Sequence, residues 1–209
     1  MLNVKVYSHD ANFPVLNKIE KSDLNFLDVG CGAGQNAAQL FSIGKIIDGI
    51  TISPQEAKEG KHYFRNIFIQ NLEHGLPEKV KELNYDVVLC SHVLEHIAYP
   101  EKLLEDILNL TLKNGAKLII ALPNFLHYNN RFKIFKGNFD YTESGLMDNT
   151  HVRWYTFKSA QELFQKRGFK VISSEVDGNL PFYSITKYLP FLVQKMIKKI
   201  FIVFLFILS

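Results

Sequence analysis

Short apolar runs alternate with amphipathic segments over most of the 209 residues of this chain. The apolar runs have the length of buried β-strands, whereas the segments between them carry apolar residues at helical spacing. Strands that alternate with helices are typical of a parallel, doubly wound α/β sheet, so the pattern predicts this fold class. The expected strands lie within 25–29, 45–52, 66–70, 85–90, 115–122 and 169–176.

Capping residues mark the ends of two predicted helices. Ser53 fits an N-cap, Pro54 the first helical position, and Glu56 the acid of a capping box. Thr156 fits the N-cap of a later helix, and Gly168 fits the glycine that follows its end. The predicted helices span 13–21, 36–43, 53–63, 99–112 and 156–168.

The C-terminal segment 187–209 is apolar and basic, and two interpretations of it stay open. Ile200–Leu208 is an unbroken apolar run with the length of a strand that is buried on both faces. Alternatively, the apolar residues lie in an acidic membrane surface while the lysines reach the water. Charges interrupt the segment too often for a clear membrane span. Its lysines are Lys187, Lys195, Lys198 and Lys199.

Composition and charge fit one globular domain with a sizeable core, because 47% of the residues are hydrophobic and 22% are charged. The net charge of +3 comes from the tail, which holds four of the 24 basic residues. The rest of the chain has 20 basic and 21 acidic residues and is nearly neutral. A near-neutral body argues against a nucleic-acid partner. Cys31 and Cys90 lack metal-finger spacing, and the N-terminus lacks an apolar signal core, so we expect a cytoplasmic protein.

The segment Asn25–Asn36 is the most informative motif, since a strand there breaks into a glycine-rich turn that opens a helix. Glycine permits positive φ and a close approach of ligand to backbone, and the helix start presents unpaired N–H groups. The spacing Gly30-x-Gly32-x-Gly34 differs from the dinucleotide pattern, whose third glycine comes one residue later. A nicotinamide-dependent oxidoreductase is therefore disfavoured.

A second group of polar residues follows the predicted fourth strand. Ligands of doubly wound sheets bind beyond the carboxyl ends of the strands, so these residues belong to the expected site. If a helix begins near Ser91, then His92, Glu95 and His96 share one of its faces. Two imidazoles and a carboxylate at that spacing can provide a general base or hold a metal ion.

The segment 124–155 is expected to be a lid inserted after the fifth strand. About 30 residues separate that strand from the next helix, which is long for a loop without a function. Its aromatic rings can stack on a flat, hydroxylated substrate, while His, Asp and Arg side chains fix the polar groups. A lid that only shields a cofactor is the alternative.

Together these motifs resemble a known family. The glycine turn with Asp28 two residues before it resembles motif I of class I S-adenosylmethionine (SAM) dependent methyltransferases. Residues 123–156 are similar to a bacterial subgroup that occurs with glycosyltransferases in surface-polysaccharide and cell-wall glycan pathways. The resemblance covers about residues 24–177. It implies a single Rossmann-like domain over 1–209, with an antiparallel last strand beside the fifth, and it favours the strand interpretation of the tail. The motifs that carry the similarity to this subgroup are Pro123-Asn124, Gly137-x-Phe139-x-Tyr141 and Gly145-Leu146-x-Asp148-x-Thr150-His151-x-Arg153.

The resemblance implies SAM as the cofactor. In the family an acid commonly ends the second strand and accepts hydrogen bonds from the ribose, but this chain has Thr51 there. The acid–apolar pair that reads adenine corresponds to Asn71 and Leu72, and asparagine can still bond an adenine edge. The cofactor-binding residues that the resemblance implies are Asp28, Gly30, Cys31, Gly32, Gly34, Asn36, Thr51, Ile52, Asn71, Leu72, Ser91 and His92.

The expected reaction is methyl transfer to an oxygen of a sugar or glycan intermediate. A hydroxyl is a poor nucleophile, so a general base helps, and His151 or His96 is the candidate. Glu95 is expected to orient an imidazole, and Asp148 and Arg153 to orient the acceptor. A lipid-linked glycan would fit a protein that also contacts the inner face of the cell membrane through its tail.

Two other functions stay open. The segment with His92, Glu95 and His96 resembles one that holds a divalent ion in ubiquinone-pathway O-methyltransferases and small-RNA 3′-end methyltransferases. This implies a metal-assisted O-methyltransferase of a quinone precursor or an RNA end. The departures at Thr51 and Asn71 instead suggest a non-catalytic SAM-binding protein in a glycan-assembly complex.

Overall fold

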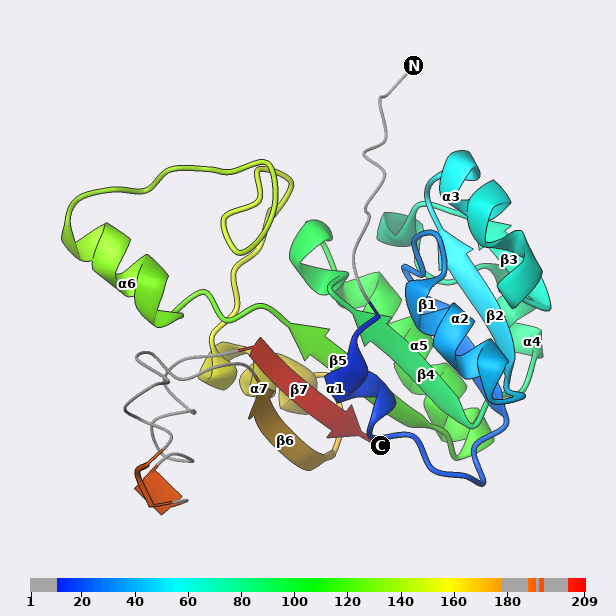
Figure 1. The fold of residues 1–209 in the computed structure, drawn as a ribbon. Helices are drawn as coiled ribbons and strands as arrows, with labels where there is room; N and C mark the ends of the chain where they lie inside the picture. Colours follow the sequence, from blue (N-terminus) through cyan, green and yellow to red (C-terminus); the bar gives the residue numbers. More distant parts are fainter. Residues whose placement is uncertain (1–10, 178–187, 191, 194–202) are drawn as a thin grey trace.

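The computed structural model describes residues 11–177, 188–190, 192–193 and 203–209. They contain one seven-stranded sheet of order β3-β2-β1-β4-β5-β7-β6 (Figure 1). The first five strands pair in parallel, and β7 is antiparallel to both β5 and β6. The predicted doubly wound, mostly parallel α/β fold is therefore confirmed. The strands are β1 (Asn25–Val29), β2 (Ile46–Thr51), β3 (Asn66–Ile69), β4 (Val87–Ser91), β5 (Lys117–Leu122), β6 (Val171–Asp177) and β7 (Val203–Leu208).

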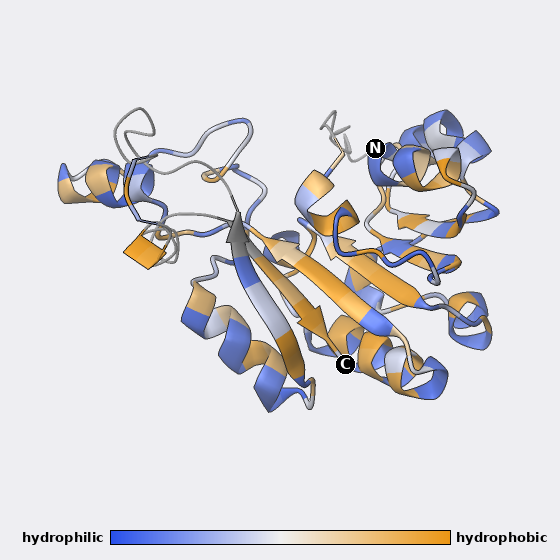
Figure 2. Cartoon of the chain, turned by 60° about the horizontal axis from the view of Figure 1, so that its bottom comes forward, coloured by the Kyte–Doolittle hydropathy of each residue, from blue (hydrophilic) through white to orange (hydrophobic). Residues whose placement is uncertain are grey.

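Helices cover both faces of the sheet, and Figure 2 shows apolar strands at the centre with polar residues on the outer sides of the helices. One apolar cluster includes residues of α5 and α7, such as Leu104 and Phe164, and the other includes Ala37 and Leu40 of α2. The α-helices are α1 (Phe13–Leu16), α2 (Gln35–Ser42), α3 (Pro54–Gly60), α4 (Glu78–Glu82), α5 (Glu101–Asn114), α6 (Tyr128–Phe135) and α7 (Phe157–Lys166). The 3₁₀ helices are η1 (Lys61–Tyr63), η2 (Leu72–His74) and η3 (Leu94–His96).

The predicted capping residues act largely as expected. Thr156 and Ser159 form a reciprocal capping box at the start of α7, and Gly168 follows its C-cap residue with φ of +92°. Ser53 accepts a hydrogen bond from the Glu56 N–H at 3.3 Å, as an N-cap should. The Ser53 N–H, however, donates to Thr51 Oγ1 at 3.1 Å, so the reciprocal half of this capping box is replaced by a contact with Thr51.

The end of the apolar tail is a buried strand. β7 lies between β5 and β6, and the Phe206 ring packs 5.5 Å from Phe157 and 5.2 Å from Phe164 between ring centroids. This confirms the strand interpretation for 203–208, whereas 194–202 lie outside the described residues. None of the helices in the described part of the chain has the length and apolarity needed to cross a membrane. Contact of the tail with a membrane surface stays a prediction.

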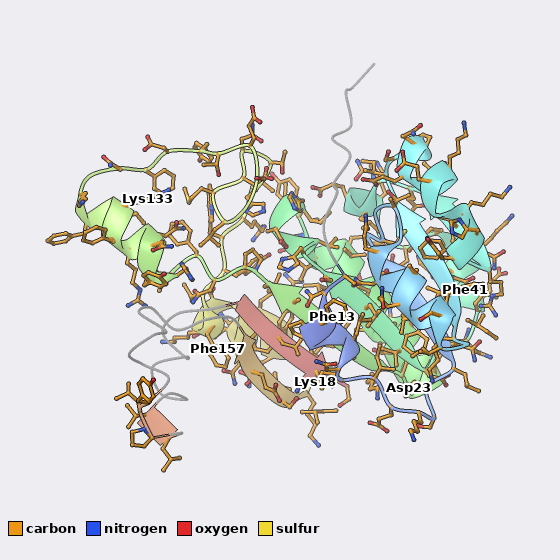
Figure 3. The ribbon with its side chains drawn as sticks, in the orientation of Figure 1. Phe13, Lys18, Asp23, Phe41, Lys133 and Phe157 are labelled. Atoms are coloured by element: carbon orange, nitrogen blue, oxygen red, sulfur yellow. The ribbon has the colours of Figure 1, made fainter. Side chains whose placement is uncertain are left out.

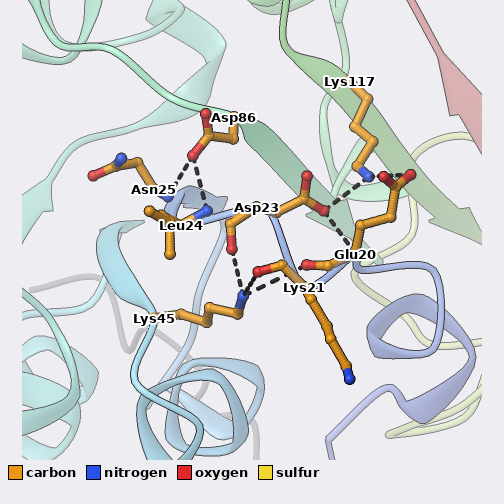
Figure 4. Close-up of polar contacts among 8 residues, drawn as sticks. All are labelled: Glu20, Lys21, Asp23, Leu24, Asn25, Lys45, Asp86 and Lys117. Carbon is orange, nitrogen blue, oxygen red and sulfur yellow. Dashed lines mark hydrogen bonds and ion pairs between the residues drawn. The ribbon is translucent and has the colours of Figure 1, made fainter.

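A polar network ties together the amino ends of the strands (Figure 4). Lys117 at the start of β5 pairs with Asp23 at 2.8 Å, and Lys45 donates to the backbone carbonyl of Asp23. Asp86, just before β4, accepts hydrogen bonds from the N–H groups of Leu24 and Asn25, and these bonds lower the pKa of its carboxyl. The network connects the residues at this end of the sheet, opposite the end where the glycine turn lies.

The segment between β5 and α7 departs from the sheet. Its helix α6 projects to one side of the molecule and carries Lys133 (Figures 1 and 3). The chain returns to the sheet through a parallel bridge between Asn124 and Tyr155. Segment 124–155 thus forms an excursion that begins and ends at the carboxyl end of β5. Its movement as a lid stays a prediction.

Candidate functional site

A cavity of about 1240 Å³ lies over the carboxyl ends of the strands, where the doubly wound fold predicts a site. Residues just after β1, β2, β3, β4 and β5 form one side of it, and residues of 124–155 form the other. Most residues implied for the cofactor line it, although Asp28 and Gly34 lie outside the lining. The implied residues in the lining are Gly30, Cys31, Gly32, Asn36, Thr51, Ile52, Asn71, Leu72, Ser91 and His92.

The three glycines of the turn have positive φ, at +73° for Gly30, +54° for Gly32 and +91° for Gly34. A Cβ on Gly30 would lie 2.4 Å from Val93 Cγ2, and one on Gly34 would lie 2.9 Å from Phe64. A Cβ on Gly32 would meet only Gln35 Oε1, at 3.6 Å. Gly30 and Gly34 therefore serve packing, while Gly32 leaves a cradle open to the cavity.

Asp28 lies behind the turn and is 1% exposed. Its Oδ2 has no hydrogen-bond partner among the described residues, and burial raises the pKa of the carboxyl to about 7. A carboxylate without a partner is costly to bury, so the folded protein favours the neutral acid. This is one of the few buried polar groups of the described chain that nothing in the fold satisfies.

Asp28 should therefore make the folded state less stable as the pH rises. Between about pH 4 and pH 7 the folded chain holds a proton that the unfolded chain has released, so stability falls through this window. The shift corresponds to at most about 4 kcal/mol. We expect Asp28→Asn to remove this dependence in urea unfolding curves recorded from pH 4 to pH 8. Asp140→Asn, at an exposed position, should retain the dependence of the parent, and an unchanged profile for Asp28→Asn would refute the assignment.

The residues after β4 do not form the expected α-helix. His92 has φ of +56°, the only positive value among the described residues other than glycine, and a 3₁₀ turn follows over Leu94–His96. Positive φ at such a residue is strained and is often found at functional sites. His92 Nδ1 lies 3.3 Å from Glu95 Oε1, and Glu95 is 1% exposed. The prediction that His92, Glu95 and His96 share one helical face is therefore wrong.

Glu95 and His96 meet His151 from segment 124–155 instead. The rings of His96 and His151 pack edge to face with centroids 4.7 Å apart, and ligand atoms of the three residues lie within 4.8 Å of one another. Apart from the 3.3 Å contact of Oε1 with His92 Nδ1, which is not a hydrogen bond, both oxygens of Glu95 lack a partner among the described residues. This set could hold a divalent cation. In the metal-assisted alternative, His151 therefore replaces His92 as the third candidate ligand beside Glu95 and His96.

Hydrogen bonds fix the orientation of both imidazoles. His96 Nδ1 lies 3.3 Å from the Thr150 carbonyl and 3.1 Å from Thr150 Oγ1, which in turn donates to Asp148 Oδ1 at 2.7 Å. His151 Nδ1 lies 3.2 Å from the Leu146 carbonyl. Because a carbonyl only accepts, these contacts assign the proton to Nδ1 in each neutral ring and leave the lone pair on Nε2.

His96 has the protonation state that a general base needs. Burial lowers the pKa of its imidazole, and this effect outweighs the opposing charge of Glu95. The ring is therefore neutral at neutral pH. His96 lines the cavity and is less buried than His151, which is 8% exposed. The geometry favours His96 as the base and His151 as its packing partner.

Asp148 and Arg153 have other partners than an acceptor in this structure. Asp148 lines the cavity, but its Oδ1 accepts hydrogen bonds from the N–H and hydroxyl of Thr150. Arg153 lies outside the cavity lining, and its Nε donates to the Ala98 carbonyl at 2.7 Å. Asp148 thus orients His96 through Thr150. The contact of Arg153 joins the end of segment 124–155 to the loop between η3 and α5.

The aromatic rings of segment 124–155 pack against one another. Phe125, Phe139, Tyr141 and Trp154 have ring centroids 5.8 to 6.2 Å apart. None of them lines the cavity, so the expectation that they stack on a substrate is not supported. Polar side chains line this side instead, among them Asn124, Asn130, Thr142 and Asp148.

Some lining residues were not singled out from the sequence. Glu56 of α3 accepts a hydrogen bond from Thr51 Oγ1 at 2.6 Å and lines the cavity beside it. Asn12 donates to Ser91 Oγ at 2.9 Å and also lines the cavity. In the sequence, Glu56 is already explained as the acid of a capping box, and Asn12 belongs to no motif. Their positions at the cavity are therefore seen only in the folded chain.

Comparisons with known proteins identify the domain. The sequence model of a family described as "Methyltransferase domain" matches residues 8–174. The ubiquinone biosynthesis O-methyltransferase of Rickettsia bellii (strain OSU 85-389) is 33% identical over 103 residues, which cover 48% of this chain and 42% of that protein. The sterol 4-C-methyltransferase strm-1 of Caenorhabditis elegans is 28% identical over 112 residues, covering 51% and 33%. The chain spans less than half the length of these curated relatives.

Solved structures share the fold at low identity. A SAM-dependent methyltransferase from Archaeoglobus fulgidus superposes with a TM-score of 0.63 at 18% identity, covering 90% of this chain and 86% of that one. Magnesium protoporphyrin IX methyltransferase from Synechocystis PCC 6803, solved with bound S-adenosylhomocysteine (SAH), gives a TM-score of 0.58 at 17% identity, covering 88% and 73%.

Proposed function

The chain belongs to the methyltransferase domain family, and from this premise we propose that it transfers a methyl group from SAM to a hydroxyl oxygen of a sugar or glycan intermediate. The observation that carries the proposal is the imidazole of His96, which lines the cavity and is oriented by the hydrogen bonds of its Nδ1. An aliphatic hydroxyl is a poor nucleophile and needs such a base to take its proton.

The residues present fit SAM. The open cradle at Gly32 leaves room for the cofactor to lie against the backbone of the turn, next to the start of α2. Asn71 and Leu72, which the resemblance implies for the adenine, and Thr51, which it implies for the ribose, all line the cavity. The cavity of about 1240 Å³ exceeds the 300–1000 Å³ usual for one small ligand, so cofactor and acceptor fit together.

SAM, when bound, supplies a methyl group on a sulfonium centre. The protein has to hold the acceptor oxygen in line with that group at about 3–3.5 Å and to remove its proton. His96 Nε2 takes the proton, while Asp148, acting through Thr150, keeps the ring in the correct orientation. Residues of 124–155 line one side of the cavity, so an acceptor bound against them would displace water from the reacting atoms.

The polar lining on the acceptor side supports a sugar. Asn124, Asn130, Thr142 and Asp148 offer both donors and acceptors at distinct positions, as recognition of several hydroxyls requires. Asn130 is 5% exposed, and its amide already contacts the Phe125 carbonyl at 3.3 Å. A polar wall of this kind, whose atoms outside these internal hydrogen bonds could contact a ligand, suits an acceptor with hydroxyls around a ring.

Metal-assisted methylation of a phenolic quinone precursor is the second candidate. It is favoured by the cluster of Glu95, His96 and His151, which has the donors of a divalent-cation site, and by relatives named ubiquinone biosynthesis O-methyltransferase. In this alternative the imidazoles are metal ligands, and the acceptor has neighbouring phenolic hydroxyls.

One assay separates the two candidates. Transfer of radioactive methyl from SAM would be measured with nucleotide sugars and lipid-linked glycans on one side and with catechols on the other, each with and without EDTA. We expect labelled sugar products whose formation EDTA does not change. Labelled catechols alone, formed only with added Mg²⁺ or Zn²⁺, would establish the second candidate and overturn the first.

A further inference from the structure

We propose that Glu56 of α3 binds the ribose hydroxyls of SAM, a role that no residue at the end of β2 can fill in this chain. Two neighbouring hydroxyls are bound most strongly by a carboxylate, which accepts from both. The last residue of β2 is Thr51, which offers one hydroxyl. The inference rests on the cofactor and not on the proposed acceptor.

The cavity offers few carboxylates for this role. The acidic residues that line it are Glu56, Glu73, Glu95 and Asp148. Glu95 and Asp148 belong to the histidine cluster on the acceptor side. Glu73 accepts hydrogen bonds from the N–H groups of Ala98 and Tyr99 at 2.6 and 3.2 Å and so closes a loop. Glu56 is the carboxylate that lies beside the glycine turn and the end of β2.

Its position is fixed before any ligand binds. Glu56 is 4% exposed, and its Oε2 accepts from Thr51 Oγ1 at 2.6 Å. The Ser53 N–H donates to Thr51 Oγ1 at 3.1 Å, so the hydroxyl proton of Thr51 is directed at the carboxylate. Burial, Asp28 and then Glu56 raise the pKa of the Cys31 thiol, which places the Glu56 charge close to the turn.

The contact with Thr51 is compatible with ribose binding. An ionised carboxylate has about four acceptor positions, so it can bond one threonine hydroxyl and two ribose hydroxyls together. Thr51 then acts as a positioning residue, because it aims the carboxylate and does not replace it. A carboxylate held in place in this way loses little side-chain freedom when the cofactor binds.

Calorimetric titration with SAH and with its 2′,3′-dideoxyribose analogue tests the proposal without any acceptor. For the parent protein we expect the analogue to bind about 10- to 100-fold more weakly than SAH. Glu56→Gln should weaken SAH binding by a similar factor and leave the affinity for the analogue unchanged. Thr51→Val should cause a smaller loss of the same kind, because the carboxylate remains but is less well aimed.

Glu59→Gln is the matched control, since it makes the same change on the exposed side of α3 and should alter neither affinity. Comparing two ligands on one variant cancels any effect on folding. Equal losses for SAH and the analogue in Glu56→Gln, or no loss for SAH, would overturn the proposal. The titrations contain no acceptor substrate. Their results therefore test the role of Glu56 even if the proposed sugar acceptor is wrong.

Discussion

Replacing His96 with glutamine is expected to lower kcat by a factor of about 10² to 10⁴ and to leave the affinity for SAH unchanged. Glutamine keeps a polar group of similar reach but has no basic nitrogen. The parent rate should fall at acid pH as His96 is protonated, with a midpoint below its ordinary pKa because burial lowers that pKa. This acid limb should be absent from the pH–rate profile of the variant.

His74→Gln provides the control for this experiment, because His74 is exposed and does not line the cavity. Its kcat and pH profile should equal those of the parent. If His96→Gln retained full kcat, the base would have to be His151, whose Nε2 is available in the same cluster. A matching loss of SAH affinity would instead show that His96 supports the fold of the site.

Replacing Gly32 with arginine is expected to weaken SAH binding by a factor on the order of 10³ or more. The side chain would project from the turn into the open cradle and occupy the space of the cofactor. Its positive charge would also repel the sulfonium of SAM. The φ of +54° adds backbone strain of about 1 to 2 kcal/mol for any side chain.

Gly44→Arg is the control that distinguishes the effect of backbone strain from the effect of filling the cofactor's space. Gly44 has φ of +79°, nothing lies within 4 Å of its missing Cβ, and it does not line the cavity. Both variants therefore suffer a similar loss of thermal stability, but only Gly32→Arg should lose SAH binding in calorimetry. Equal affinities of the two variants for SAH would mean that the cofactor does not lie against the turn.

The fold could be predicted because its signals are local. Apolar runs of strand length, the caps at Ser53 and Thr156 and the glycine turn each act within a few residues of the chain. The strand order follows from the general behaviour of such sheets. The pattern after β4 failed because helical spacing alone cannot reveal the positive φ of His92, which turns the chain before a helix can form.

The acceptor side could be predicted only in part, because distant contacts build it. His151 meets Glu95 and His96 through the path of segment 124–155, which no local periodicity encodes. The aromatic rings of that segment pack against one another and do not line the cavity. The departure at Thr51 suggested a non-catalytic protein. Our proposal for Glu56 explains it differently, because the Thr51 hydroxyl donates to that carboxylate.

The insertion of β7 between β5 and β6 has a consequence for biosynthesis on the ribosome. About 80 residues separate Leu122 from Val203, and at 5–20 residues per second their translation takes roughly 4 to 16 s. Throughout this interval the apolar edge of β5 has no neighbour, and β6 emerges without the strand that will join it to the sheet. The nascent chain therefore presents an open strand edge to chaperones until β7 is synthesised and joins β6 to the sheet.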